Sequence, residues 1–208
     1  MPDCAPALAR RWLLLGALLL AAGASAWAHR PLFSEVAPSG YGQALEIREP
    51  EVSQVFYSRL DPASPRTWFV FTGGAGRETY LSLGVPVLER LRAFRPKLAL
   101  LGPGLPPVEL PFDLPAGVGG MVFEAAGEPR FFHEPVTGTD SWILLEATVR
   151  LPVSGRFYVV AFPAQSPPAG DKLWISIGTR ERFGLRELLG LGRIKRFVRK
   201  FHEKSRAQ

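Results

Sequence analysis

The sequence predicts a mainly β protein, an antiparallel β-sandwich or jelly roll with an N-terminal signal helix and a C-terminal amphipathic helix. Three observations lead to this fold class. Between residues 43 and 179, short apolar runs rich in Val, Ile, Phe, Tyr and Trp alternate with clusters of Gly, Pro and Asp. Such a pattern is typical of short strands joined by turns. An apolar segment precedes this region and a basic amphipathic segment follows it.

Residues 1–28 have the organisation of a secretory signal peptide. Arg10 and Arg11 supply positive charge, residues 12–22 form an apolar run, and small residues follow. The run is much shorter than the ~20 residues of a membrane-spanning helix. Small-x-small cleavage patterns end at Ala26 and at Ala28, so the exported chain would begin at Trp27 or at His29. An uncleaved leader would instead act as an anchor. We expect an exported protein, in the periplasm or at the cell surface.

Ten strands are expected in the central domain, residues 29–183, because their residue types favour pleated structure and turn residues separate them. Residues 87–94 are expected to form a helical turn. The glycines at 73–76 do not precede a helix, as a phosphate loop requires, and are interpreted as a hairpin turn. The expected strands are Gln43–Ile47, Gln54–Arg59, Thr67–Thr72, Thr79–Val85, Lys97–Gly102, Gly120–Glu124, Arg130–His133, Trp142–Leu151, Arg156–Phe162 and Lys172–Gly178.

The C-terminal tail, residues 184–208, carries the excess charge of the chain. It has eight basic and two acidic side chains, a net +6, whereas residues 29–183 have fifteen basic and sixteen acidic ones. Since the central domain is nearly neutral, the charge pattern indicates a basic tail and not a nucleic-acid-binding domain. The one cysteine, Cys4, lies in the leader, so the exported chain would have no disulfide.

The tail also predicts a helix that docks on an anionic membrane surface. Its apolar residues recur at helical spacing and its basic residues occupy the other side, as in interfacial helices. Gly190 and Gly192 are expected to form a hinge before this helix. The alternative is that the apolar stripe packs on the sandwich. The residues assigned to membrane binding are Arg193, Ile194, Lys195, Arg196, Phe197, Val198, Arg199, Lys200, Phe201 and Lys204.

No catalytic motif is present, and we predict a protein that is not an enzyme. There is no Gly-x-Ser-x-Gly elbow and no His-Glu-x-x-His helix. His133, Asp140 and Ser141 could form a triad only through folding, because their proximity in the chain has no bearing on triad geometry. The predicted strands also carry Trp68, Trp142 and Trp174, which we expect to pack in the core. Exposed tryptophans would instead indicate a sugar-binding or peptide-binding face.

Parts of the sequence resemble two known exported families. Residues 67–72 and 80–83, together with the segment 151–160, resemble the bacterial pre-peptidase C-terminal domain, and this resemblance implies a non-catalytic jelly-roll accessory module. The start of the exported chain, His29-x-x-Leu32 followed by Pro38 and Gly40, resembles copper-binding sandwiches of the CopC type. In that family the N-terminal histidine is a metal ligand, but its second ligand position is Leu151 here.

The sequence therefore leads to two hypotheses. The first is an exported, non-catalytic β-sandwich without a cofactor that binds an envelope or extracellular partner, a protein or a glycan, and has a membrane-docking tail. The alternative is a copper-binding protein or oxidase, in which His29 and His133 hold the metal through imidazole and amine nitrogens with Glu35 or Glu134 nearby.

Overall fold

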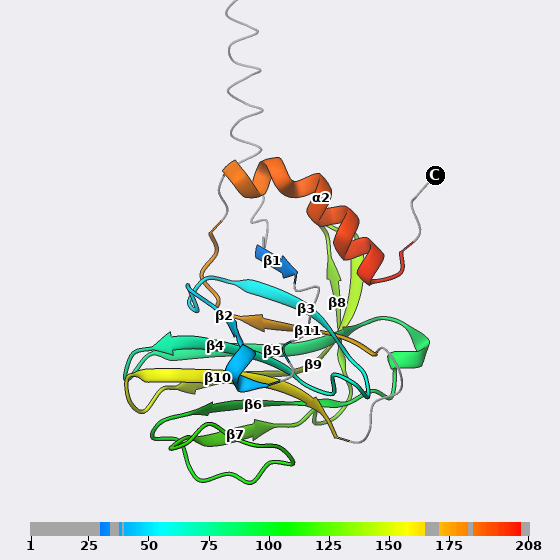
Figure 1. Ribbon diagram of the computed structural model, residues 1–208. Coiled ribbons are helices and arrows are strands. Elements are labelled where there is room, and N and C mark those ends of the chain that lie inside the picture. Colours follow the sequence, from blue (N-terminus) through cyan, green and yellow to red (C-terminus); the bar gives the residue numbers. More distant parts are fainter. Residues whose placement is uncertain (1–29, 34–37, 39, 165–170, 183–184, 205–208) are drawn as a thin grey trace, which may run out of the picture.

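The computed structural model describes residues 30–33, 38, 40–164, 171–182 and 185–204. The predicted signal peptide and His29 lie outside these residues. Two β-sheets stack face to face (Figure 1), and all but two of their strand pairs are antiparallel. The six-stranded sheet has the order β1 (Arg30–Phe33), β3 (Gln54–Leu60), β11 (Asp171–Ile177), β5 (Glu78–Pro86), β9 (Thr139–Arg150) and β8 (Arg130–Glu134). The five-stranded sheet has the order β2 (Leu45–Glu46), β4 (Thr67–Gly73), β10 (Gly155–Pro163), β6 (Pro96–Gly102) and β7 (Gly119–Phe123).

The predicted fold class is confirmed, and each of the ten expected strands is present with ends shifted by a few residues. The first of them is shortened to β2 because the 3-10 helix η1 (Tyr41–Gln43) precedes it. The expected helical turn is the 3-10 helix η2 (Glu89–Leu91). One strand, β1, was not predicted. It pairs in parallel with β3 at the sheet edge, where Pro31 is tolerated since an edge strand leaves some backbone groups unpaired.

The glycines at 73–76 do not form the predicted hairpin turn. They connect β4 to β5, which belong to different sheets, so the chain crosses the sandwich at this point. Gly76 has a φ of 74°, a conformation that glycine adopts without steric cost. Local turn residues predict a change of direction, but they do not determine whether the next strand returns to the same sheet.

The core between the sheets is made of aliphatic and aromatic side chains from both of them, including Phe56, Leu83, Phe157 and Ile175. The outer faces of the sheets are also covered. The segment 103–118 covers one side of the five-stranded sheet, where Phe112 packs against Trp68. Because both faces are covered, nearly every residue of β4 and β11 is buried, and neither strand alternates regularly between buried and exposed residues.

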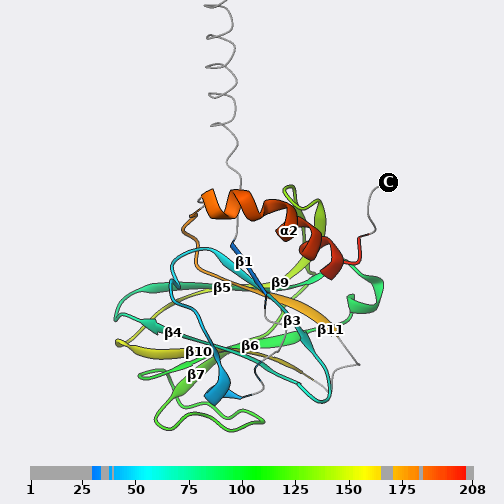
Figure 2. The same cartoon turned by 45° about the horizontal axis from the view of Figure 1, so that its top comes forward.

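The outer face of the six-stranded sheet is covered by α2 (Leu185–Phe201). The helix lies on the side away from the five-stranded sheet, with the end of β8 beside it (Figure 1, Figure 2). The predicted hinge is wrong, since α2 runs without interruption through Gly190 and Gly192. Tertiary packing at the end of the helix outweighs the cost of about 1 kcal/mol that an interior glycine imposes. No helix among the described residues is long and apolar enough to span a membrane.

Candidate ligand-binding pocket beneath the C-terminal helix

A pocket lies on the outer face of the six-stranded sheet. Side chains alternate between the two faces of a strand, so Phe56 and Ile175 enter the core whereas Tyr57 and Trp174 point outward. Trp174 lies opposite Tyr57 on one side and Gly84 on the other. A Cβ atom at Gly84 would approach the Trp174 ring to 2.2 Å. The glycine in β5 therefore makes room for the indole to lie across the neighbouring strand.

The cavity has a volume of about 700 Å³. Its floor comes from β3, β5, β9 and β11, one wall from β8 and the following turn, and the remainder from the segment after β11 and from the end of α2. The described lining residues are Ser53, Val55, Tyr57, Tyr80, Ser82, Arg130, Phe132, Glu134, Pro135, Thr139, Ser141, Ile143, Glu146, Trp174, Ser176, Gly178, Thr179, Glu181 and His202. Aromatic rings and aliphatic side chains thus alternate with hydroxyl groups across one concave surface, as is common in ligand-binding pockets.

Three residues form a polar chain at the helix end of the pocket. The Trp174 indole N–H donates to Ser141 Oγ at 3.1 Å, and Ser141 Oγ lies 3.1 Å from His202 Nε2. His202 Nδ1 lies 2.9 Å from the Val198 carbonyl oxygen. A carbonyl can only accept, so Nδ1 carries the proton, and Nε2 of the neutral ring accepts from Ser141. The chain fastens the end of α2 to the floor of the pocket.

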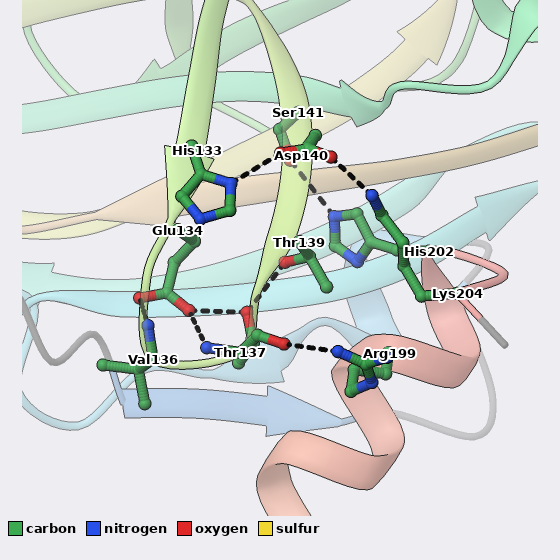
Figure 3. A network of polar contacts seen from close by, with 10 residues as sticks. All are labelled: His133, Glu134, Val136, Thr137, Thr139, Asp140, Ser141, Arg199, His202 and Lys204. Atoms are coloured by element: carbon green, nitrogen blue, oxygen red, sulfur yellow. Dashed lines mark hydrogen bonds and ion pairs between the residues drawn. The ribbon is translucent and has the colours of Figure 1, made fainter. Parts of the chain in front are cut away.

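The charge state of His202 agrees with this arrangement. The pKa of His202 is lowered from its ordinary value chiefly because burial disfavours the charged ring, although the hydrogen bond to Val198 opposes the shift. The imidazole is therefore neutral over a wider pH range than a free histidine. Figure 3 shows Ser141 in contact with His202, and the Asp140 carboxylate between His133 and Lys204.

A second group of contacts holds the C-terminal end of α2 against the sheet. Lys172 is 2% exposed, and its Nζ donates to the Phe201 carbonyl oxygen at 2.7 Å and to Glu203 at 2.6 Å. Glu203 also pairs with Arg90. These two cations lower the pKa of Glu203 to about 2. Glu203 has a φ of 56°, a conformation that usually requires glycine after a helix, and its two ion pairs offset this strain.

The opposite rim of the pocket carries a triad of polar groups. The Tyr80 hydroxyl donates to Glu146 at 2.6 Å, and Arg130 donates to the other carboxylate oxygen at 2.8 Å. Burial and the bond to Glu146 raise the pKa of Tyr80 to about 12. Burial opposes ionisation of Glu146, but the hydrogen bonds from Tyr80 and Arg130 outweigh it and lower the pKa of the carboxyl group. The rim therefore holds a fixed ion pair beside a neutral phenol.

Of the two histidines proposed as metal ligands, only His133 is among the described residues. His133 is on β8, its side chain is 54% exposed, and its Nδ1 lies 2.7 Å from Asp140. β1, whose first residue directly follows His29, is at the opposite edge of the sheet from β8. No group of three or more His, Cys, Asp or Glu side chains suited to a metal occurs among the described residues. The brace of His29 and His133 stays a prediction.

A triad of His133, Asp140 and Ser141 is not formed. His133 contacts Asp140, but Ser141 lies on the other face of β9 and contacts His202. Adjacent residues of a strand point to opposite faces, so Asp140 and Ser141 cannot both serve one site. Trp68 and Trp174 are buried, at 1% and 7% exposed, but they belong to the clusters on the outer faces of the two sheets and not to the core between them. Trp142 is half-buried and packs against that core as expected.

The apolar stripe of the tail packs partly on the sandwich. Val198 and Phe201 are buried, and the Phe201 ring lies 4.9 Å from that of Tyr57. Ile194 is half-buried, and Phe197 is 36% exposed while contacting Tyr57. The sheet covers Val198 and Phe201 in this position of α2, and their assignment to a membrane surface stays a prediction.

The six basic residues assigned to membrane binding divide into two groups. Arg199 donates to the Thr137 carbonyl oxygen and Lys204 pairs with Asp140, so both help to hold the helix in place (Figure 3). The other four, Arg193, Lys195, Arg196 and Lys200, are exposed. We call these four residues the basic face of α2.

The pocket residues Ser141, Trp174, Ser176 and His202 were missed as a site by sequence reasoning. They come from three elements, and no spacing in the chain links them. The available signal was weak: β5 and β11 each carry a serine inside an apolar run, two residues after an outward-facing aromatic residue. Such a serine marks a polar spot on a covered face.

Several solved structures are similar to this chain, whereas no family model and no curated protein sequence matches it. The pre-peptidase C-terminal domain of collagenase from Bacillus anthracis aligns with a TM-score of 0.37 and 10% identity, over 69% of this chain and 99% of the domain. The module that the sequence resembles is thus among the similar structures.

Two further neighbours are similar to about the same degree. PliG of Aeromonas hydrophila, a periplasmic inhibitor of g-type lysozyme, has a TM-score of 0.35 and 12% identity, covering 74% of this chain and all of PliG. The secreted copper-binding protein MopE of Methylococcus capsulatus has a TM-score of 0.35 and 11% identity, with coverage of 74% and 100%. At this level of similarity, neither neighbour identifies a ligand for this chain.

Proposed function

We propose that this protein is an exported, non-catalytic β-sandwich that docks on an anionic membrane surface through the basic face of α2 and presents the sandwich to an envelope or extracellular partner. The observation that carries this proposal is the placement of Arg193, Lys195, Arg196 and Lys200. All four are exposed on a helix whose other side is fastened to the sheet. The helix thus offers a fixed array of cations.

Charge along the helix supports the same interpretation. From residue 188 to residue 202 the sequence contains no acidic side chain, and the next acid, Glu203, is already paired with Lys172 and Arg90. Each basic residue near an anionic surface contributes about 1 kcal/mol, and salt screens this attraction. The proposal differs from the sequence-based one in its contact residues: the charges carry the docking, while Val198 and Phe201 stay on the sheet.

Co-sedimentation with phosphatidylglycerol–phosphatidylcholine vesicles tests the proposal. The variant R193Q/K195Q/R196Q/K200Q removes four charges from the basic face. We expect its vesicle affinity to fall by up to roughly three orders of magnitude, at about 1 kcal/mol per charge. Binding of the unaltered protein should weaken with added salt and with removal of the anionic lipid.

A matched control removes the same total charge elsewhere. The variant R48Q/R92Q/R150Q/R156Q changes four exposed arginines outside α2 and should retain most of the vesicle binding. An equal loss in both variants would show that only the net charge matters. Binding that is indifferent to salt and to anionic lipid would exclude electrostatic docking altogether.

A further inference from the structure

Beyond membrane docking, we infer that the pocket beneath α2 binds a small organic cation with an apolar body, such as an aryl or alkyl ammonium compound. Three properties of the described lining lead to this ligand class: its aromatic surface, its unpaired hydroxyl and its charge.

The aromatic surface suits the apolar body of such a ligand. Trp174, Val55 and Ile143 form a buried cluster on the outer face of the sheet, with Tyr57 and Phe132 packed against it. All five line the cavity. Aromatic faces attract cations through their quadrupole, by about 0.5–2 kcal/mol per ring. Several rings around one cavity are therefore a typical environment for an ammonium group.

The unpaired hydroxyl belongs to Ser176, which lies in the floor of the pocket. Ser176 is 5% exposed, and its Oγ has no hydrogen-bond partner among the described residues. A buried polar group without a partner costs about 1–3 kcal/mol, so native structures rarely retain one without a reason. An N–H donor of a bound ligand would satisfy this oxygen.

The charge of the lining favours a cation. Three carboxylates line the cavity, those of Glu134, Glu146 and Glu181, against the single guanidinium of Arg130. Arg130 is engaged by Glu146 at 2.8 Å, so the pair leaves no free positive charge for an anionic ligand. Burial is the main cause that raises the pKa of the Tyr57 phenol, and the nearby negative charge of Glu134 raises it further. Its carboxylate thus acts on the aromatic part of the pocket.

The inference is tested by calorimetric titration of the protein with three ligands of the same shape. These are 1-naphthylmethylammonium, 1-naphthylmethanol and 1-naphthoate, which differ in charge but share the apolar body. We expect the cation to bind at least roughly tenfold more tightly than the alcohol, and the anion to bind more weakly than either. Equal affinities for cation and alcohol, or no binding of the cation, would overturn the inference.

Two variant pairs locate the binding. Glu146→Gln should weaken binding of the cation about tenfold while changing alcohol binding little. The control is Glu109→Gln, which should change neither affinity, because Glu109 is exposed in the segment that covers the other sheet.

The second pair is read by fluorescence: Trp174→Phe should abolish the ligand-induced change in tryptophan fluorescence, whereas Trp68→Phe should retain it. Loss of the signal in both or in neither tryptophan variant would place the ligand elsewhere. Because vesicles are absent, these results do not depend on membrane docking.

Discussion

At the scale of single residues, Lys172 connects the last turn of α2 to the sheet. It is an outward-facing residue of β11, it is almost fully buried, and it donates to one carbonyl and one carboxylate of the helix terminus. A buried ammonium group is retained in a protein only where such partners replace its hydration. Lys172 therefore stabilises the position of α2 more than a surface ion pair would.

We predict that Lys172→Met lowers the free energy of unfolding by about 1–3 kcal/mol, because it leaves the Phe201 carbonyl oxygen unpaired in a buried place. The measurement is urea denaturation. Lys97→Met is the control, since Lys97 pairs with Glu124 at the surface and such pairs contribute about 0–1 kcal/mol. Equal effects of the two substitutions would show that Lys172 does not hold the helix.

A second prediction at this scale concerns His202 and pH. Its pKa is lowered in the folded state, chiefly by burial, and the charges facing it are those of Lys172, Asp140 and Lys204. The unfolded chain thus takes up this proton at a higher pH than the folded protein does. The contribution of His202 to stability is complete above the ordinary pKa of 6.5 and is lost as the pH falls toward the lowered value.

Urea denaturation at about pH 7.5 and about pH 5 measures this dependence. We expect the unaltered protein to lose more stability on acidification than His202→Gln, whose side chain does not titrate. His133→Gln is the control, because His133 is exposed and its removal should leave the difference in place. An unchanged pH dependence in His202→Gln would contradict the assignment.

At the scale of secondary-structure elements, α2 is continuous although two glycines lie in its interior. Its C-terminal end is held by three contacts: Lys172 of β11 donates to the last residue of the helix, His202 contacts β9, and Glu203 pairs with Arg90. Helices in proteins are stabilised mainly by the packing of one face rather than by propensity. The glycines therefore lower the stability of the helix without breaking it.

We predict that Gly192→Ala raises the free energy of unfolding by about 0.5–1 kcal/mol, since alanine loses less conformational entropy in a helix interior. A Cβ at Gly192 meets no atom within 4 Å, so no clash opposes the gain. Thermal unfolding measures the effect. Gly84→Ala is the opposite case, because its Cβ would collide with Trp174, and it should destabilise the protein. Destabilisation by Gly192→Ala would indicate that a bend is needed at this point.

At the scale of the whole molecule, the sandwich has two separately covered outer faces. Among the residues whose burial the structure describes, the core between the sheets contains none from α2, so the main hydrophobic contacts of the sandwich do not involve this part of the helix. The outer face of the six-stranded sheet does need it, since Tyr57 and Trp174 would otherwise face water. Without the helix this face would be an open apolar surface, whereas with the helix it forms a pocket.

A chain that ends at Arg182 tests this division. We expect it to keep a β-type far-UV circular dichroism spectrum but to bind the apolar dye ANS and to self-associate, as exposed apolar patches do. A chain that ends at Lys204 is the control and should behave like the full protein. A truncated chain that is unfolded, or one that binds no dye, would show that α2 has a different role.

The sequence by itself determined the order and approximate bounds of ten strands and the amphipathic character of the tail. Both follow from local patterns, namely side-chain periodicity and turn residues such as those at 73–76. Residues 30–33 were missed because four residues with a proline give too short a pattern.

Tertiary structure alone decided which strands share a sheet, where the helix stripe is buried and which side chains meet in the pocket. Ser141, Trp174 and His202 are distant in the chain, and their contact depends on strand order and on the docking of α2. The amphipathic pattern of the tail predicted a buried face, but such a face can be buried either in a membrane or against a protein sheet. The choice between them depends on complementary groups such as Lys172 and Tyr57, which local sequence cannot place.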